Sequence, residues 1–297
     1  MKISLKRLLP VLSALLFAAS VHAANPSDWW VDVTNDRASK VEAMLAQGAD
    51  PNEISSQGQP AIMQAIRDGA WHVYDVLVVH PKTVLNAINV NRETPLMYLA
   101  VIGETKRAQD LIRRGALVNR LGWTPLQYAA SKGHLDTVQM LLNNKALVNA
   151  PAPDGTTALM MAALAGSEPV VQLLLRAGAD VTMQNLNGYD AARWARVRNH
   201  EKLAVELDAL IASSLAERAA LRERNRRAGP ASSDGGGPTQ APAMVPGTPG
   251  TTAVPTAPND PPGNADVRSP STPPERTNST SGSRYFDLER FEKDPQP

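Results

Sequence analysis

A segment of about 33 residues recurs along this chain of 297 residues. Its copies start at Thr94-Pro95-Leu96, Thr124-Pro125-Leu126 and Thr157-Ala158-Leu159, and each start is followed by an alanine-containing stretch, a glycine and a second apolar stretch. A fixed period of this length indicates small units that stack, because none of them can bury a core alone. The repeat therefore limits the fold to an array of similar layers.

Each unit predicts two short helices. Thr94, Thr124 and Thr157 are placed to cap the first helix through their hydroxyl groups. Pro95 and Pro125 stand at the first helical position, where a missing N–H costs nothing. Alanine pairs in the first helix allow close layers, and leucine pairs in the second form a buried seam. We therefore expect an all-α fold of helix pairs joined by short β-hairpin loops.

The pattern T-P-L-x-x-A-A-x-x-G, followed by L-L-x-x-G-A-x-x-N, resembles the ankyrin repeat, with its fullest copies at 123–149 and 156–180. The resemblance implies a solenoid of about six helix-turn-helix repeats over residues 24–213, whose surface binds other proteins. Arg193, Arg196 and Arg198 add charge to the last helix pair, where internal copies are small or apolar. That pair is therefore expected to be a terminal repeat with a polar outer face.

Residues 1–23 have the composition of a secretory signal peptide. Lys2, Lys6 and Arg7 precede an apolar run over 8–21, and residues 21–23 supply a small-residue cleavage site. We expect cleavage after residue 23, export to the periplasm of a Gram-negative bacterium, and no membrane segment afterwards. An uncleaved membrane anchor is the alternative, but the run is short for a bilayer. The chain has no cysteine, so it forms no disulfide bond.

The composition changes after the repeats. Residues 214–228 are predicted to form a charged helical extension that ends in basic side chains, as suits the helix dipole. Residues 229–283 are dominated by Pro, Gly, Ser, Thr and Ala and are expected to be a disordered linker. The aromatic and charged segment 284–297 follows, and we predict that Tyr285, Phe286 and Phe291 bind a partner. An ordinary chain terminus is the alternative.

Patterns that carry enzymatic chemistry are missing from the sequence. It has no Gly-rich phosphate loop, no G-x-S-x-G nucleophile motif and no H-E-x-x-H zinc motif. His72 and His80 have no further ligands at metal-binding spacing, and His134 and His200 follow turns where the ankyrin pattern prefers histidine. The net charge of +1 gives no general attraction to nucleic acid. We expect a non-enzymatic protein without cofactor or metal.

In ankyrin-like stacks the loop tips and the exposed ends of the first helices form a concave surface for recognition. The motif places five apolar or aromatic residues there: Val101, Ile102, Trp123, Leu164 and Tyr189. We predict that they form an exposed strip that binds a protein, with Trp123 on the tip of a loop about three residues shorter than the others. The alternative is that they only pack against neighbouring loops.

These features favour a monomeric scaffold or adaptor that binds a protein partner in the periplasm and does not bind nucleic acid. One alternative is an immunity or inhibitor protein for a toxin or hydrolase that acts in the envelope. Another is a structural protein that tethers the envelope through the basic helix and tail. A linker of about 55 residues spans roughly 40 Å. The terminal segment is therefore also able to return to the concave surface of its own chain.

Overall fold

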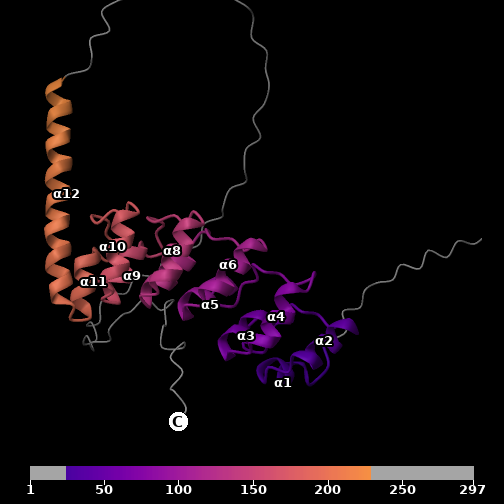
Figure 1. The fold of residues 1–297 in the computed structure, drawn as a ribbon. Helices are drawn as coiled ribbons and strands as arrows, with labels where there is room; N and C mark the ends of the chain where they lie inside the picture. Colours follow the sequence, from indigo (N-terminus) through magenta and orange to yellow (C-terminus); the bar gives the residue numbers. More distant parts are fainter. Residues whose placement is uncertain (1–24, 229–297) are drawn as a thin grey trace, which may run out of the picture.

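The computed structural model describes residues 25–228, which form a stack of six helix pairs (Figure 1). The all-α solenoid expected from the repeat is confirmed in this part of the chain. The predicted signal peptide 1–23, the linker 229–283 and the terminal segment 284–297 lie outside the described residues.

The helices form an inner and an outer layer. The inner helices are α1 (Trp29–Thr34), α3 (Ala61–Asp68), α5 (Pro95–Ile102), α7 (Pro125–Ser131), α9 (Ala158–Leu164) and α11 (Ala191–Val197). The outer helices are α2 (Ala38–Ala46), α4 (Trp71–Val79), α6 (Thr105–Arg113), α8 (Leu135–Asn143), α10 (Glu168–Arg176) and α12 (Glu201–Ala228). Each inner helix packs on the inner helices of the adjacent pairs, so the layers follow the order of the sequence.

The predicted threonine caps are confirmed. Thr94, Thr124 and Thr157 each accept a hydrogen bond from the backbone N–H three residues later. Gln127 adds a capping box, since its Oε1 accepts from the Thr124 N–H at 2.8 Å. Its Nε2 donates to the carbonyls of Ala150 and Thr156, both at 2.9 Å. This cap therefore also fixes the next loop.

The core is the seam between the two layers. The alanine pairs 129–130 and 162–163 are fully buried, as are Leu141 and Leu174. Tyr98 and Tyr128 are buried as well and pack inside the stack. One residue of each leucine pair lies deeper than the other, because a helix presents consecutive residues to different directions.

A ladder of asparagine side chains joins each repeat to the next. Asn119 is typical, since its Oδ1 accepts from the Leu147 N–H at 2.9 Å and its Nδ2 donates to the Lys145 carbonyl at 2.8 Å. The equivalent pairs of bonds are made by Asn52, Asn86 and Asn149. The ladder sets the register of successive loops, because each side chain binds both a donor and an acceptor of the next one.

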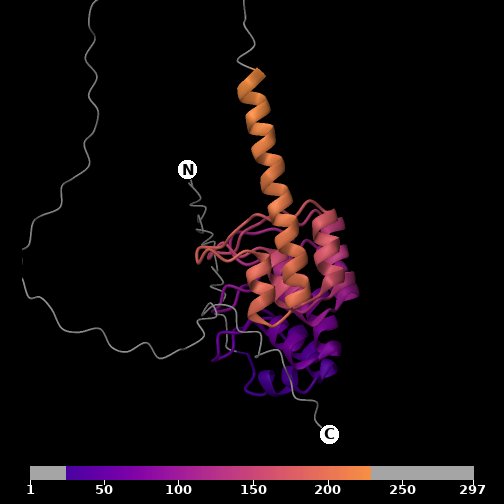
Figure 2. The same ribbon diagram turned by 90° about the vertical axis from the view of Figure 1, so that its left-hand side faces the viewer.

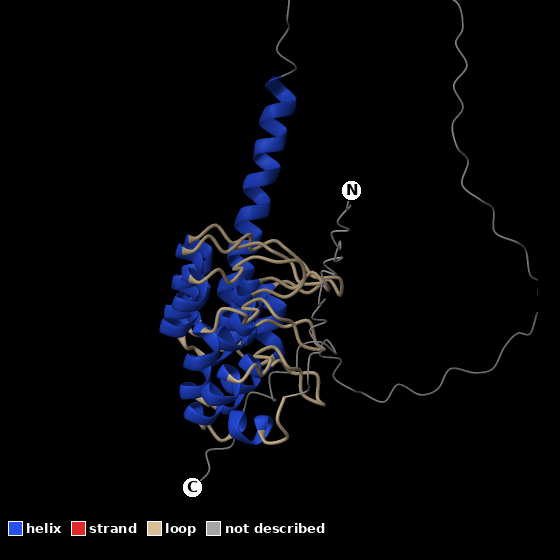
Figure 3. Ribbon diagram, turned by 90° about the vertical axis from the view of Figure 1, so that its right-hand side faces the viewer, coloured by secondary structure: helices blue, strands red, loops and turns tan. Residues whose placement is uncertain are grey.

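The loops differ from the predicted β-hairpins. They turn back on one side of the stack, but within residues 25–228 the β pairing is limited to an isolated bridge between Ile54 and Pro60 (Figure 3). Their backbone groups are used in turns and in contacts with adjacent loops, such as the Leu186 N–H with the Asp154 carbonyl at 2.8 Å.

Helix α12 is longer than the other outer helices. It is continuous from Glu201 to Ala228, so the predicted boundary between residues 213 and 214 falls inside one helix. Its first half packs on α11, and its second half projects beyond the stack (Figure 2). Arg196 pairs with Glu201 and Asp208 at this end, consistent with a polar terminal face.

Candidate functional site

The tips of the five loops between helix pairs gather on one side of the stack (Figure 3). The last four tips each expose an apolar side chain, and the tip row is defined here as Val90, Leu121, Pro153 and Leu186. The first loop exposes Ser56 and Gln57 at its tip. The exposed fractions of Val90, Leu121 and Leu186 are 71%, 95% and 81%. Side chains this exposed add little to the hydrophobic stability of the fold. Their apolar surface is available for a ligand.

The tip row is continuous because each tip touches the next. The contacts are Gly58 with the Val90 side chain, the Arg92 carbonyl with Arg120, Gly122 with Pro153, and the Asp154 carbonyl with the Leu186 N–H. A side chain at Gly58 would occupy the space of Val90 Cγ1, so a glycine is required for this close approach. The four apolar residues therefore form a ridge across the last four loops.

The short loop places a different residue at its tip than the sequence suggests. Leu121 is at the tip, and Gly122 follows with φ of 92°, which turns the chain back toward the helices. Trp123 is half-buried and meets Tyr128 edge-on, with ring centroids 6.4 Å apart. The prediction that Trp123 forms the tip is wrong, because the glycine reverses the chain one residue earlier.

The predicted strip of exposed helix-end residues is largely covered. Val101 is only 2% exposed, so the prediction that it faces solvent is wrong. The next repeat covers the end of α5, where His134 Nε2 lies 2.9 Å from the Val101 carbonyl oxygen. Ile102 and Leu164 are half-buried and pack against the core. Their side chains are therefore partly exposed apolar surface at the ends of the inner helices.

The remaining predicted site residues are Tyr189 and the three aromatic residues of the terminal segment. Tyr189 is half-buried, with the Arg193 guanidinium 4.9 Å from its ring centroid and Trp194 packed edge-on at 5.8 Å. It therefore belongs to the last layer of the stack. Tyr285, Phe286 and Phe291 lie outside the described residues, and their predicted role in binding is not tested by the fold.

A buried polar network supports the middle of the tip row. Glu93 is 1% exposed, and its carboxylate accepts from Asn89 Nδ2 at 2.8 Å and from the Tyr128 hydroxyl. Asn89 Nδ2 also lies 3.1 Å from the Tyr98 hydroxyl, and Gln59 Nε2 donates to the same hydroxyl at 2.6 Å. The network crosses three repeats, so it holds neighbouring loops in a fixed relation.

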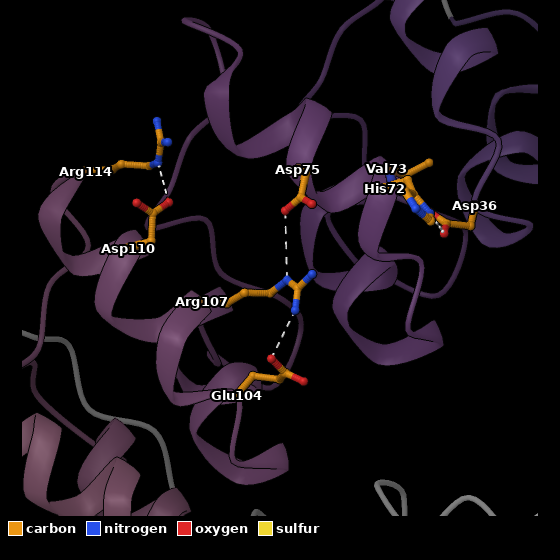
Figure 4. Close-up of polar contacts among 8 residues, drawn as sticks. All are labelled: Asp36, His72, Val73, Asp75, Glu104, Arg107, Asp110 and Arg114. Atoms are coloured by element: carbon orange, nitrogen blue, oxygen red, sulfur yellow. Dashed lines mark hydrogen bonds and ion pairs between the residues drawn. The ribbon is translucent and has the colours of Figure 1, made fainter.

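The outer helices carry paired charges (Figure 4). Asp36 accepts from the Val73 N–H at 2.9 Å and lies 2.6 Å from His72 Nδ1. Burial opposes ionisation of Asp36, but these hydrogen bonds together hold the pKa of its carboxyl below the ordinary value. The N-terminus of α4 has no side-chain cap of its own. Asp36, which belongs to the preceding repeat, supplies the missing acceptor for a backbone N–H in the first turn of α4.

Arg107 joins two repeats on the same face (Figure 4). Its guanidinium is 3.1 Å from Glu104, 3.9 Å from Asp75 and 4.3 Å from the Trp71 ring centroid. Nearby, the hydrogen bond from Arg114 lowers the pKa of the Asp110 carboxyl. These groups stabilise the stack by neutralising one another, as surface ion pairs do.

Other site classes find little support in the part of the chain that the structure describes. Within residues 25–228, no group of three or more His, Cys, Asp or Glu side chains is arranged to hold a metal ion. The same span has no helix with the length and apolar character needed to cross a bilayer. The tip row is therefore the candidate site.

The sequence-based prediction missed the tip row, although a signal was present. Val90 stands between Asn89 and Asn91, and Leu186 stands between Asn185 and Asn187. Asparagine favours tight turns, so an aliphatic residue between two asparagines indicates an apolar side chain on a loop tip.

Comparison with known proteins agrees with the geometry. Residues 103–185 match the family described as ankyrin repeats (three copies). Ankyrin repeat and SAM domain-containing protein 6 of Rattus norvegicus is 28% identical over 141 residues, which are 48% of this chain and 13% of that protein. E3 ubiquitin-protein ligase XBAT33 of Arabidopsis thaliana is 31% identical over 142 residues, or 48% of this chain and 27% of the relative. The matched segment thus covers less than a third of the length of either relative.

A solved structure extends the match to the three-dimensional fold. The ankyrin repeat domain of Bcl-3, a member of the IkappaB protein family, aligns with a TM-score of 0.51 and 28% sequence identity. The alignment covers 60% of this chain and 82% of the Bcl-3 chain. With the six stacked helix pairs and the capped inner helices, these matches show that the chain contains an ankyrin-repeat domain.

Proposed function

We propose that this protein is a non-enzymatic scaffold or adaptor that binds a partner protein through the tip row. The proposal rests mainly on one observation, the exposed apolar side chain at each of four consecutive loop tips. Contiguous exposed apolar surface is uncommon on monomers and usually marks an interface. Ile102, Trp123 and Leu164 add half-buried apolar surface beside the row.

The shape of the row indicates the kind of surface that it fits. The tips form a ridge, so the complementary partner surface is a groove or an apolar depression. Leu121 is the most exposed of these side chains and lies in the central loop, where interface residues that dominate binding are usually found. The buried Glu93 network holds the loops in place before the partner binds. Less conformational entropy of the loops is therefore lost when the complex forms.

A capture experiment tests the proposal. The bait is the mature chain 24–297 in a native periplasmic extract, compared with the variant V90S/L121S/L186S. The control variant L117S/L147S removes two leucines that are 60% and 61% exposed and lie near the starts of two of the loops, away from their tips. We expect the wild type and the control to retain a partner that the tip-row variant loses, with circular dichroism confirming that all three fold. Retention of the same partner by the tip-row variant would refute the proposal.

We further propose that the protein acts in the periplasm of a Gram-negative bacterium. The support is the composition of residues 1–23, with basic residues, an apolar run and a small-residue cleavage site. N-terminal sequencing of protein from fractionated cells should begin at Ala24 in the periplasmic fraction. Protein with an intact N-terminus in the cytosolic fraction would contradict this location.

A further inference from the structure

Two arginines lie in the middle of the tip row, on consecutive loops. Arg92 follows Val90 at the tip of the second loop, and Arg120 precedes Leu121 at the tip of the third. The guanidinium of Arg120 donates to the backbone carbonyl of Arg92, so the two residues are held in contact across the loops. Their positive charges therefore share one place on the ridge, beside the exposed side chains of Val90 and Leu121.

Neither arginine has an ionic partner in the part of the chain that the structure describes. Arg92 is exposed and Arg120 is half-buried, and within residues 25–228 neither of them forms an ion pair. Burial, and then the positive charge of Arg92, lower the pKa of the Arg120 guanidinium. The pair is thus a contact between like charges, and a bound anion would relieve it.

The carboxylates close to the pair in the sequence and at the next tip are used elsewhere. Glu93 is buried beneath the loops, where it accepts from Asn89 Nδ2 and from the Tyr128 hydroxyl. Asp154, at the next tip, accepts from the Thr156 N–H at 3.0 Å. An ionised Glu93 would balance only one of the two guanidinium charges. A net positive charge therefore remains at the surface of the ridge.

The surroundings of the pair indicate the class of anion that fits. The exposed fractions of Val90 and Leu121 are 71% and 95%, so apolar surface accompanies the two charges. A nucleic-acid backbone would leave these aliphatic side chains in water, and a long polyanion would meet Asp154 at the next tip. A protein segment with an acidic side chain between apolar ones covers both the charges and the apolar surface.

Arginine is well suited to hold such an acidic side chain. Its planar guanidinium donates two parallel hydrogen bonds to the two oxygens of a carboxylate. The bond to the Arg92 carbonyl leaves other N–H groups of Arg120 for a ligand, because a guanidinium carries five of them. The same bond restricts the Arg120 side chain before binding, which reduces the entropy lost in the complex.

We propose that the tip row binds an acidic segment of its partner protein, with an Asp or Glu carboxylate of that segment held by Arg92 and Arg120. Apolar residues on either side of this acid contact Val90 and Leu121. The inference rests on the proposed function, since it requires that the partner binds the tip row. It adds the chemistry of the segment that the partner presents.

Selection of peptides on the mature chain 24–297 tests the proposal without knowledge of the partner. A displayed library of random short peptides is selected on this chain, and the tip-row clones are defined as those that V90S/L121S/L186S no longer binds. We expect the tip-row clones to contain an Asp or Glu flanked by apolar residues. R92Q/R120Q should weaken their binding about tenfold or more, because the carboxylate then lacks its partners.

The matched control R222Q/R224Q removes the same charge from α12. Arg222 and Arg224 are also exposed, and within residues 25–228 they form no ion pair. We expect the control to leave the Kd unchanged, with circular dichroism confirming that all variants fold. Raising salt from about 50 to about 500 mM should weaken an acidic clone more than its Asn or Gln counterpart, because salt screens exposed charges.

The results separate this proposal from the proposed function. Tip-row clones that lack acidic residues, or that bind R92Q/R120Q as well as the wild type, would overturn the proposal and leave the tip row as the binding site. Equal losses in R92Q/R120Q and R222Q/R224Q would also overturn it, since the attraction would then be general. If no clone depends on the tip row, the proposed function fails first and this proposal fails with it.

A charge exchange gives a second, independent check. Arg120→Glu should bind an acidic clone more weakly than the version of that clone in which Lys replaces the acid, the reverse of the wild-type preference. An unchanged preference would overturn the proposal. A single-stranded DNA oligonucleotide tests the other class of anion. Tighter binding of this DNA than of the acidic clones, with loss in R92Q/R120Q, would contradict the choice of a protein segment.

Discussion

Glu93 stabilises several loops although it is a single buried residue. Burying a carboxylate is costly unless hydrogen bonds compensate. Here Asn89, from the loop before α5, and Tyr128, from α7 of the next helix pair, both donate to it. These hydrogen bonds offset the cost of burying the Glu93 side chain and fix the arrangement of the loops below the tip row.

The Tyr128 hydroxyl should matter for stability. Tyr128→Phe removes a donor to the buried Glu93 carboxylate and leaves the ring in place. We expect the free energy of unfolding to fall by about 1–3 kcal/mol, the cost of leaving a buried polar group unsatisfied. Urea denaturation measures it. In the control Tyr189→Phe, the lost hydroxyl makes no hydrogen bond within residues 25–228, so the change should be small. Equal effects of the two substitutions would show that the network contributes nothing.

Asp36 should make stability depend on pH. Its folded-state pKa is lowered by the hydrogen bonds from Val73 and His72, while an unfolded Asp titrates near 4. A lowered pKa means that this contribution is fully present above about pH 4 and is lost as the pH falls through the lower folded-state value. Asp36→Asn keeps the left-handed backbone, which asparagine also adopts, at φ of 55°.

The measurement is urea unfolding of the wild type and Asp36→Asn at several pH values. We expect the wild type to be more stable near pH 6 and the difference to shrink as the pH is lowered below about 4. A difference that stays constant over this range would mean that Asp36 does not contribute through its charge.

At the scale of elements, the asparagine ladder determines how one helix pair is placed on the next. The inner helices pack through small alanine side chains, which allow close approach but give little directional preference. The paired hydrogen bonds of each ladder residue supply that direction. Val84, Leu117 and Leu147 occupy equivalent positions in successive loops because the ladder binds their backbone N–H groups.

Removal of one ladder residue should weaken the contact between two pairs. Asn119→Ala loses the bonds to Lys145 and Leu147, and we expect a loss of about 1–2 kcal/mol in the free energy of unfolding. Asn187→Ala is the control, since the Asn187 side chain forms no hydrogen bond within residues 25–228. Thermal or urea unfolding compares them. If Asn119→Ala were as stable as the control, the ladder would have no energetic role.

The elements themselves were largely predictable from the sequence. Thr94, Thr124 and Thr157 cap their helices as the spacing indicates, because a cap depends on residues only three positions apart. The continuity of α12 was not predicted, since its packed and projecting halves differ in composition. Neither Gly nor Pro interrupts residues 201–228, so local propensity allows one helix to continue beyond its support.

At the scale of the whole molecule, the candidate site was only partly predictable. Val101 appears exposed when one repeat is considered alone, but His134 of the next repeat covers the end of its helix. Leu121, and not Trp123, forms the tip of the short loop because of the backbone direction at Gly122. Exposure in a solenoid depends on the neighbouring layer, which lies about 33 residues away in the sequence. Patterns within one repeat cannot contain that information.

The tip row crosses the last four loops of the stack. A solenoid forms such a row readily, because one exposed residue per repeat becomes a line when the repeats stack. The row is thus available for a partner protein.

The central claim is that the tip row binds the partner, and the affinity of the purified complex tests it most directly. Isothermal titration compares the wild type with Leu121→Ser and Leu117→Ser, two leucines four residues apart on one loop. The account predicts that Leu121→Ser weakens binding by about tenfold or more, as expected for a central anchor, and that Leu117→Ser leaves the Kd unchanged. Equal affinity of the wild type and Leu121→Ser would contradict it.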